Sequence, residues 1–428
     1  MNITMTPDRT TPPPVNRVES ITLPSARTTV LGNGMRVVAI HDPSLEITRV
    51  ALSADGGTAD AANPAVPCIA GRIQAEGTPE LSGTMIAELI DANGSWMSNV
   101  VATHHSTTTF YALPSRLERV LPVMADIIFR PVFPAKELEL AIAKSAANAR
   151  LRESTVRYQS ALASNSATFG ASHPMARPIS PEHIESVTRH ELIEFRSRFS
   201  SPAQMTLFLT GNIDSALETA IDRHFGSLPS LPTVPIVFKP FSPEAPGVRT
   251  IHLPHARQSA VTMTIPAVPR SHPDYIPLRL TLMALGGYFG SRLSQRIREE
   301  LGLTYGISAA LLGYEEGGVA QIATECNSDS VERLIDETKA EIRRLALQPP
   351  SHEELSRICQ AETASLLEVV ETPFSVTEFY QAIHHSGQQE SYFYDRLKAA
   401  RTITADTISR MASTYLDPDR LIISVAAP

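Results

Sequence analysis

Cysteine and tryptophan are scarce in this chain, which has three cysteines and one tryptophan among its 428 residues. Cys68, Cys326 and Cys359 are odd in number and far apart in the sequence. This excludes a small secreted scaffold held together by disulfides, and it fits a reducing compartment. We therefore expect a cytoplasmic protein.

Long apolar runs and clusters of basic residues are also missing. No run of about 18 apolar residues occurs, so we expect no membrane-spanning helix. No Lys/Arg run stands out and the net charge is −8, so we expect no nucleic-acid partner. Residues 1–20 are polar, contain the run Pro12-Pro13-Pro14 and have no apolar core. We interpret them as a flexible tail and not as a signal peptide.

One sequence pattern occurs twice, at an offset of 216 residues from Thr188 to Thr404. Both threonines are suited to cap the start of a helix. At the same offset, the apolar run Met205–Leu209 corresponds to Leu421–Val425. A constant offset across a helix, a turn and a strand indicates an internal duplication. We predict an α+β fold of two homologous halves, each with a mixed or antiparallel sheet and helices packed on one face.

A proline-rich segment separates the halves. Residues 228–248 contain Pro229, Pro232, Pro235, Pro240, Pro243 and Pro246. Such a density of proline prevents helix formation and favours extended backbone, as in a linker. We therefore place the N-terminal half at residues 21–227 and the C-terminal half at residues 249–428.

The stretch 286–305 carries the strongest local signal. Ser291 is a candidate N-cap for a helix, and Gly302 fits the position that ends one. An apolar face is predicted because three aliphatic residues recur at a spacing of four: Leu293, Ile297 and Leu301. A strand is expected to begin at Thr304.

Two hydrogen-bond donors flank this helix end. Arg298 falls in the last turn and Tyr305 just beyond the stop. A guanidinium fork and a phenol hydroxyl suit the carbonyl oxygens of a peptide or an oxyanion. Spacing alone favours a plainer interpretation, in which Arg298 caps the helix and Tyr305 is a core residue of the strand. Arg292 and Arg296 are expected to face solvent or the partner half.

The same stretch strongly resembles the second half of the pitrilysin/insulinase-type metallopeptidases, the inverzincins. Three segments of the first half look similar to that family as well: Leu31–Val38, Glu76–Thr78 and His173–Pro178. The similarity runs from about Thr29 to the C-terminus. It implies that Arg298 and Tyr305 contact bound peptide, and that the two halves face each other as a clamp.

The zinc motif of that family is missing. Its H-x-x-E-H positions fall on Cys68, Gly71 and Arg72, and its third ligand falls near Ala146-Ala147. A catalytic zinc needs about three protein ligands and an open position for water. One thiol, one glycine and one cation cannot supply them, so we expect no metal and no other cofactor in this chain. The remaining close histidines are not expected to bind metal either: His104-His105, His384-His385 and the pair His252/His255.

Cys68 is a candidate nucleophile, because Arg72 lies one helical turn further on and could lower the pKa of its thiol. A cysteine at a former ligand position is more often a small buried apolar residue.

The leading hypothesis is a zinc-free subunit of a two-chain zinc peptidase. The resemblance implies that a homologous subunit brings the zinc and the general base, while this chain brings Arg298 and Tyr305. The partner would be that zinc-bearing chain, in a heterodimer, or a second copy, in a homodimer. The ligand would be a peptide substrate. Two alternatives stay open: a non-catalytic scaffold that binds peptides or assembles with other proteins, and a cysteine hydrolase centred on Cys68.

Overall fold

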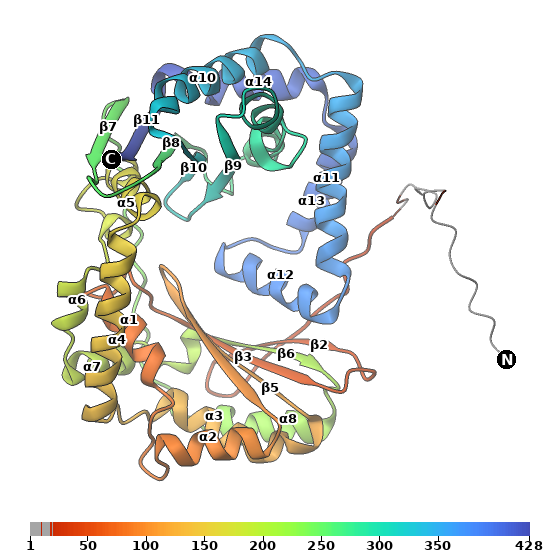
Figure 1. Cartoon of the computed structure of the whole chain (residues 1–428). Helices are drawn as coiled ribbons and strands as arrows, with labels where there is room; N and C mark the ends of the chain where they lie inside the picture. The colour runs from red at the N-terminus through yellow and green to blue at the C-terminus, as the bar shows by residue number, and fades with distance from the viewer. Residues whose placement is uncertain (1–9, 11–17, 19) are drawn as a thin grey trace.

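The computed structural model describes residues 10, 18 and 20–428 (Figure 1). The tail expected over residues 1–20 therefore lies almost entirely outside the described residues. Among the residues described, no helix combines the length and the apolar character that crossing a bilayer requires.

The N-terminal sheet has six strands in the order β1-β2-β6-β3-β5-β4. Its strands are β1 (Arg27–Val30), β2 (Arg36–His41), β3 (Thr48–Asp55), β4 (Trp96–Val101), β5 (His105–Ala112) and β6 (Met205–Gly211). β2 and β6 are parallel, and the other neighbours are antiparallel. The sheet is therefore mixed, as predicted, and β4 forms one of its edges.

One face of this sheet packs against three helices: α2 (Gly83–Ala92), α3 (Leu117–Phe129) and α8 (Ser215–Ile221). Side chains alternate along a strand, so Val50 and Leu52 of β3 point to the same face. They join Met124 of α3 and Leu217 of α8 in one buried apolar cluster.

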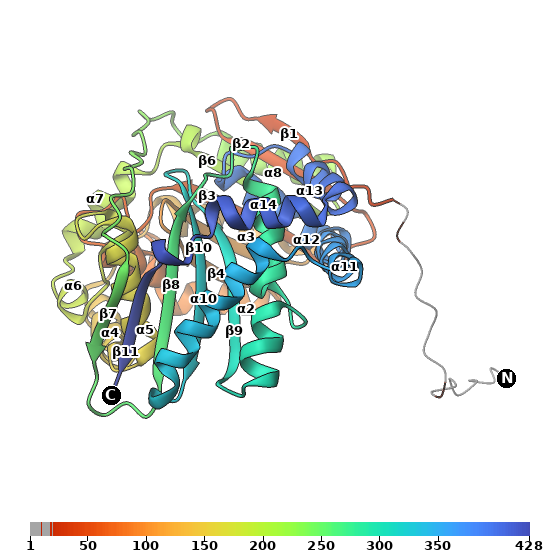
Figure 2. The ribbon, with the colours of Figure 1, turned by 90° about the horizontal axis from the view of Figure 1, so that it is seen from above.

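The C-terminal sheet has five strands in the order β7-β11-β8-β10-β9, which Figure 2 shows from above. Its strands are β7 (Gly247–His252), β8 (Ser259–Ala267), β9 (Thr304–Gly313), β10 (Gly318–Cys326) and β11 (Ile422–Ala427). Its apolar face packs against α9 (Tyr275–Leu282), α10 (Val331–Leu347) and α14 (Ala405–Tyr415). Like the first sheet, it contains one parallel pair, β7 with β11.

The two units agree where the sequence repeats. Thr188 caps α7 (Arg189–Arg198), and Thr404 caps α14 by the same bond to the third backbone amide. The strand that follows each helix, β6 or β11, lies between one parallel and one antiparallel neighbour. The predicted α+β fold with two mixed sheets is confirmed, and the matching topology is what a duplication would produce.

The second face of each sheet is covered by helices from the other half. α11 (His352–Val370), α12 (Pro373–His385) and α13 (Ser391–Thr402) pack on the N-terminal sheet around Phe208 (Figure 1). In return, α5 (Val156–Phe169) lies on the C-terminal sheet, where Ser160 Oγ is 2.8 Å from Thr262 Oγ1. Pairs of hydroxyl groups join helix and sheet both on the N-terminal sheet and on the C-terminal sheet. Polar groups therefore contribute to the packing of these helices.

The remaining helices form a third layer beside the N-terminal sheet: α1 (Ala65–Ile73), α4 (Ala135–Glu153), α6 (Pro181–Glu185) and α7. They share a separate apolar cluster. Residues 228–246 have no helix or strand, and β7 begins at Gly247. This segment is attached to the N-terminal half, because Gln204 exchanges two hydrogen bonds of 2.6 Å with the backbone of Val234.

Candidate functional site

The segment before β9 is a pair of wide helical turns, η5 (Met283–Gly287) and η6 (Ser294–Glu300), each of the π type. A methyl group added at Gly286 would lie 2.7 Å from Cβ of Ala309 in β9. Glycine at this position therefore lets the helical segment approach the strand closely.

Most of the predicted helix geometry holds. Leu293 and Ile297 are fully buried, and Gly302 adopts φ 61°, the left-handed conformation that ends a helix. The N-cap prediction for Ser291 is wrong in its chemistry. Its carbonyl accepts from the amide of Gln295 at 2.9 Å, but its buried hydroxyl has no hydrogen-bond partner among the described residues.

Three arginines of this segment have different surroundings. Arg292 Nε is 2.7 Å from a carboxylate oxygen of Glu354, and Arg296 Nε is 3.0 Å from one of Glu337. Both are bound within the C-terminal half: the expectation that they face solvent or the other half is wrong for Arg292, whereas the Arg296 side chain is still 30% exposed to solvent. No carboxylate among the described residues forms an ion pair with Arg298.

Arg298 instead lies between two aromatic rings. Its guanidinium carbon is 4.4 Å from the ring centre of Phe289 and 5.7 Å from that of Tyr305. Phe289 is 69% exposed and Tyr305 is 93% exposed. Tyr305 is therefore not a core residue of the strand, and the plainer interpretation of that residue is wrong. The rings restrain the guanidinium while its N–H donors stay available.

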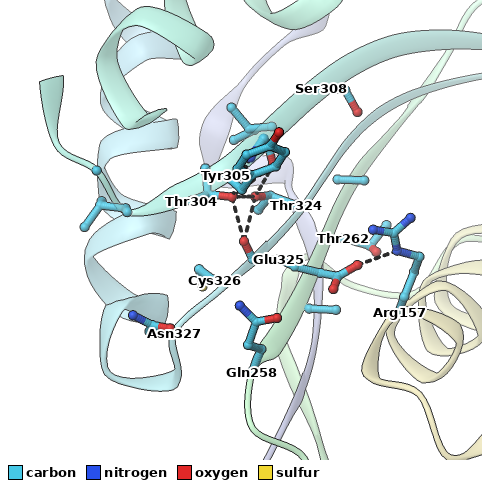
Figure 3. Close-up of a pocket in the computed structure, with 16 residues that line it drawn as sticks. Arg157, Gln258, Thr262, Thr304, Tyr305, Ser308, Thr324, Glu325, Cys326 and Asn327 are labelled. Atoms are coloured by element: carbon cyan, nitrogen blue, oxygen red, sulfur yellow. Dashed lines mark hydrogen bonds and ion pairs between the residues drawn. The ribbon is translucent and has the colours of Figure 1, made fainter. Parts of the chain in front are cut away.

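The start of β9 borders a cavity of about 730 Å³ (Figure 3). Its polar lining includes Arg157, Gln258, Thr304, Tyr305 and Glu325. Arg157 comes from α5 and forms an ion pair with Glu325 of β10, so the cavity lies where the two halves meet. β9 is the last strand of its sheet, and an unpaired strand edge can hydrogen-bond an extended peptide.

The three positions that the family resemblance assigns to the zinc motif lie together in a second cavity, of about 670 Å³. Cys68, Gly71 and Arg72 line it from α1. From α4 it receives Ser145, Asn148 and Arg152, whereas Ala147 is exposed and outside the lining. Asn148 and Arg152 were not singled out from the sequence, because no motif marks them and only the packing of α4 on α1 brings them here.

The chemistry of this lining does not fit a catalytic zinc. Cys68 provides the only thiol among the described lining residues, and burial raises the pKa of this thiol although the nearby Arg152 opposes this. A raised thiol pKa also disfavours a cysteine nucleophile at neutral pH. Among the residues described, no group of three or more His, Cys, Asp or Glu side chains could hold a metal ion.

We expect the purified protein to contain far less than one zinc per chain. The reason is the shortage of ligands at the three motif positions, where one thiol (Cys68), one glycine (Gly71) and one fixed cation (Arg72) stand. Elemental analysis after dialysis against a mild chelator measures this. One zinc per chain that survives the dialysis would contradict the expectation.

A cluster of histidines, seen from the sequence only as adjacent pairs, lines a third cavity of about 840 Å³ between the halves. His104 bridges two carboxylates: its Nδ1 is 3.1 Å from Asp60, and its Nε2 is 3.1 Å from Glu316 of the other half. His105 and His385 stack with ring centres 3.5 Å apart. Burial lowers the pKa of His105 to about 4 and that of His385 to about 3, so both are neutral at pH 7.

Comparisons with known proteins agree with the family resemblance found in the sequence. A family model described as Peptidase M16 inactive domain matches residues 186–362. The chain is 27% identical over 305 residues to an uncharacterized zinc protease of Mycobacterium leprae, covering 70% of this chain and 68% of that one. It is 22% identical over 419 residues to an uncharacterized zinc protease of Streptomyces coelicolor, covering 94% of this chain and 90% of the relative.

Two solved structures have the same fold. A peptidase M16 inactive domain from Pseudomonas fluorescens matches with a TM-score of 0.86 and 20% identity, over 94% of this chain and 98% of that one. A protease from Helicobacter pylori matches with a TM-score of 0.84 and 15% identity, over 95% and 100%. With the motif segments, these matches confirm the resemblance stated above: residues 186–362 match the Peptidase M16 inactive domain, and the chain is similar to zinc proteases in sequence and to an M16 inactive domain in fold.

Proposed function

We propose that this chain is the zinc-free subunit of a two-chain M16 peptidase. The observation that carries the proposal is the state of Arg298 and Tyr305: both offer hydrogen-bond donors beside an unpaired strand edge, and Arg298 has no ion pair among the described residues. A homologous partner chain supplies the zinc and the general base, because Cys68, Gly71 and Arg72 cannot.

Each donor has a distinct role in this proposal. Arg298 binds a carbonyl oxygen of the peptide, or the oxyanion that forms when water attacks the scissile bond. Tyr305 donates its hydroxyl proton to the same region. The Phe289 ring keeps the guanidinium in place, 4.4 Å away. A donor aimed at a developing oxyanion contributes a factor of about 100 to 1,000 in rate.

The second candidate is a non-catalytic scaffold of the same fold, which binds peptides or assembles with other proteins. The exposed aromatic rings of Phe289 and Tyr305 favour it equally, because exposed aromatics beside an arginine are typical of binding surfaces. In this case the same residues bind peptide without contributing to bond cleavage.

Mixing the chain with a zinc-bearing relative separates the two functions. We expect no peptide cleavage by this chain alone, as a monomer or homodimer. We expect cleavage when it is combined with a homologous chain that carries an intact H-x-x-E-H motif, measured with a quenched fluorescent peptide. A partner whose motif glutamate is changed to glutamine is the control. Cleavage that is independent of this chain, in every mixture, would leave the scaffold function.

A further inference from the structure

The cavity at the positions that the resemblance assigns to the zinc motif has an unusual charge. Two guanidinium groups line it, Arg72 from α1 and Arg152 from α4. No aspartate or glutamate is among the described residues that line it. Its other polar groups are neutral: Ser98 and Asn99 of β4, with Ser145 and Asn148 of α4. The cavity therefore combines two positive charges with neutral hydrogen-bonding groups.

Neither charge is neutralised within the described part of the chain. Arg72 Nη1 donates to the hydroxyl of Ser145 at 2.7 Å. Arg152 Nη2 donates to the carbonyl of Ile179 at 3.2 Å, and its guanidinium lies 5.0 Å from the ring centre of Tyr158. By contrast Arg150, two residues earlier on α4, forms an ion pair with Glu185. Arg72 and Arg152 are thus oriented by neutral partners, and most of their N–H donors remain available.

Gly71 is needed to shape this cavity. A methyl group added there would lie 2.2 Å from Oδ1 of Asn99 and 3.1 Å from a methyl of Val101, both on β4. Any larger residue would force the Asn99 side chain or α1 itself to move. Asn99 is itself held, because its Nδ2 donates to Thr108 at 2.9 Å. The glycine therefore allows α1 and the edge strand β4 to form two adjacent walls.

We propose that this cavity binds the carboxylate of an extended peptide, either a free C-terminus or an acidic side chain. Two guanidinium forks match a carboxylate in charge and in planar geometry. The unpaired edge of β4 is suited to the peptide backbone, and Ile69, Met97 and Ile184 add apolar surface that a small inorganic ion would not use. This binding site is separate from Arg298 and Tyr305, and it does not depend on the proposed catalytic role.

Three dansyl-labelled peptides of one neutral, apolar sequence test the proposal by fluorescence anisotropy with the full chain. One ends in a free carboxylate, one ends in an amide, and one is amidated but contains an internal glutamate. We expect at least one of the two charged peptides to bind about 10-fold or more tightly than the neutral amide, because each carries the charge that the cavity lacks. The first and third peptides distinguish a C-terminal carboxylate from an acidic side chain.

Variants link the binding to the two arginines. Arg152→Gln and Arg72→Lys should each weaken the preferred charged peptide about 10-fold or more, the first by removing a charge and the second by removing the fork. Arg150→Gln, on the same helix but paired with Glu185, is the matched control and should bind as the unaltered chain does. Melting temperatures confirm that each variant is folded.

Three outcomes would overturn the proposal. The first is equal binding of all three peptides. The second is unchanged affinity in the folded Arg152→Gln, Arg72→Lys double variant. The third comes from competition experiments with inorganic phosphate and with acetate. Phosphate would have to displace the charged peptide at a lower concentration than acetate does, and to bind the chain more tightly than either charged peptide. That result would assign the cavity to phosphate.

Discussion

Replacing Arg298 with alanine is expected to reduce the turnover of the two-chain peptidase about 100-fold, with little change in assembly or melting temperature. The guanidinium forms no ion pair among the described residues and lies between two exposed rings. Its removal therefore costs the fold little. If the guanidinium binds the oxyanion, its removal destabilises the transition state but not the bound substrate, so kcat and kcat/KM decrease together.

Tyr305→Phe is the milder companion variant, because it removes one hydroxyl and keeps the ring that contacts Arg298. We expect a smaller decrease in turnover than for Arg298→Ala. Arg296→Ala is a matched control on the same helical segment. Arg296 binds Glu337 and Glu300, so its loss should lower stability modestly and leave turnover per assembled complex unchanged.

These variants distinguish a catalytic role from a structural one. If Arg298 and Tyr305 matter only for the fold, activity and melting temperature should decrease together. Full activity of an assembled complex that carries both Arg298→Ala and Tyr305→Phe would contradict the catalytic proposal and leave the scaffold. The measurement is steady-state hydrolysis of a quenched fluorescent peptide, with the amount of complex determined by size-exclusion chromatography.

Local signals predicted the segment around Arg298 well. The helix ends at Gly302, which has a positive φ. Glycine adopts such a φ more readily than other residues, so this end could be predicted from the sequence. The proximity of Arg298 to Tyr305 follows from that stop. The ion pairs of Arg292 and Arg296 were missed because their carboxylate partners, Glu354 and Glu337, lie on other helices, 62 and 41 residues away.

The packing of helices from one half on the sheet of the other half could not be predicted from the sequence either. The duplicated pattern describes each half by itself, and α5 belongs to the first half by sequence order. Its buried Ser160 and Thr168 face Thr262 and Thr264 of the second half's sheet. Hydroxyl contacts of this kind leave no apolar periodicity, so the pattern of a helix that packs on a sheet is weak.

The positions that the resemblance assigns to the zinc motif illustrate a different limit of prediction from sequence. The motif positions on α1 could be counted from the sequence because they lie within one short helix. The facing positions on α4 depend on how two helices pack, and small shifts in counting change which side chain faces the cavity. The structure brings Ser145, Asn148 and Arg152 to that face, and this is why the positive charge of the cavity was not foreseen.

Changing His104 to glutamine should destabilise the chain by about 3–5 kcal/mol near neutral pH, the cost of breaking a buried ion pair from one side. His104 joins Asp60 of the N-terminal half to Glu316, which lies in the turn between β9 and β10. The side chains of Asp60 and Glu316 are only 7% and 2% exposed. Without the imidazolium, two buried carboxylates remain without their cation.

The pH dependence of stability should identify this interaction. Burial alone would lower the pKa of His104, but hydrogen bonds to Asp60 and Glu316 outweigh it and raise the pKa to about 9. The folded chain therefore retains this proton above pH 6.5, the ordinary value, where the unfolded chain loses it. The stabilisation is complete below pH 6.5 and is lost as the pH rises through 9, by about 3 kcal/mol in all.

The neighbouring histidines set the acidic limit. Burial lowers the pKa of His105 and of His385, and the nearby imidazoles lower both pKa values further because they disfavour the charged form. The unfolded chain therefore takes up protons first as the pH falls below 6.5, and stability decreases toward pH 4. Together with His104, this predicts a maximum of stability near pH 6.5, with a decrease on both sides.

Urea denaturation between pH 5 and pH 10 measures these slopes. We expect the free energy of unfolding of the unaltered chain to decrease between pH 6.5 and 9. The His104→Gln variant should be less stable at pH 6.5, and its free energy of unfolding should change little over the same range. His190→Gln is the control, because the His190 side chain is 87% exposed and its single carboxylate contact is 3.9 Å long. A slope between pH 6.5 and 9 that is equal in the unaltered chain and in His104→Gln would show that His104 does not hold the two halves together as a cation.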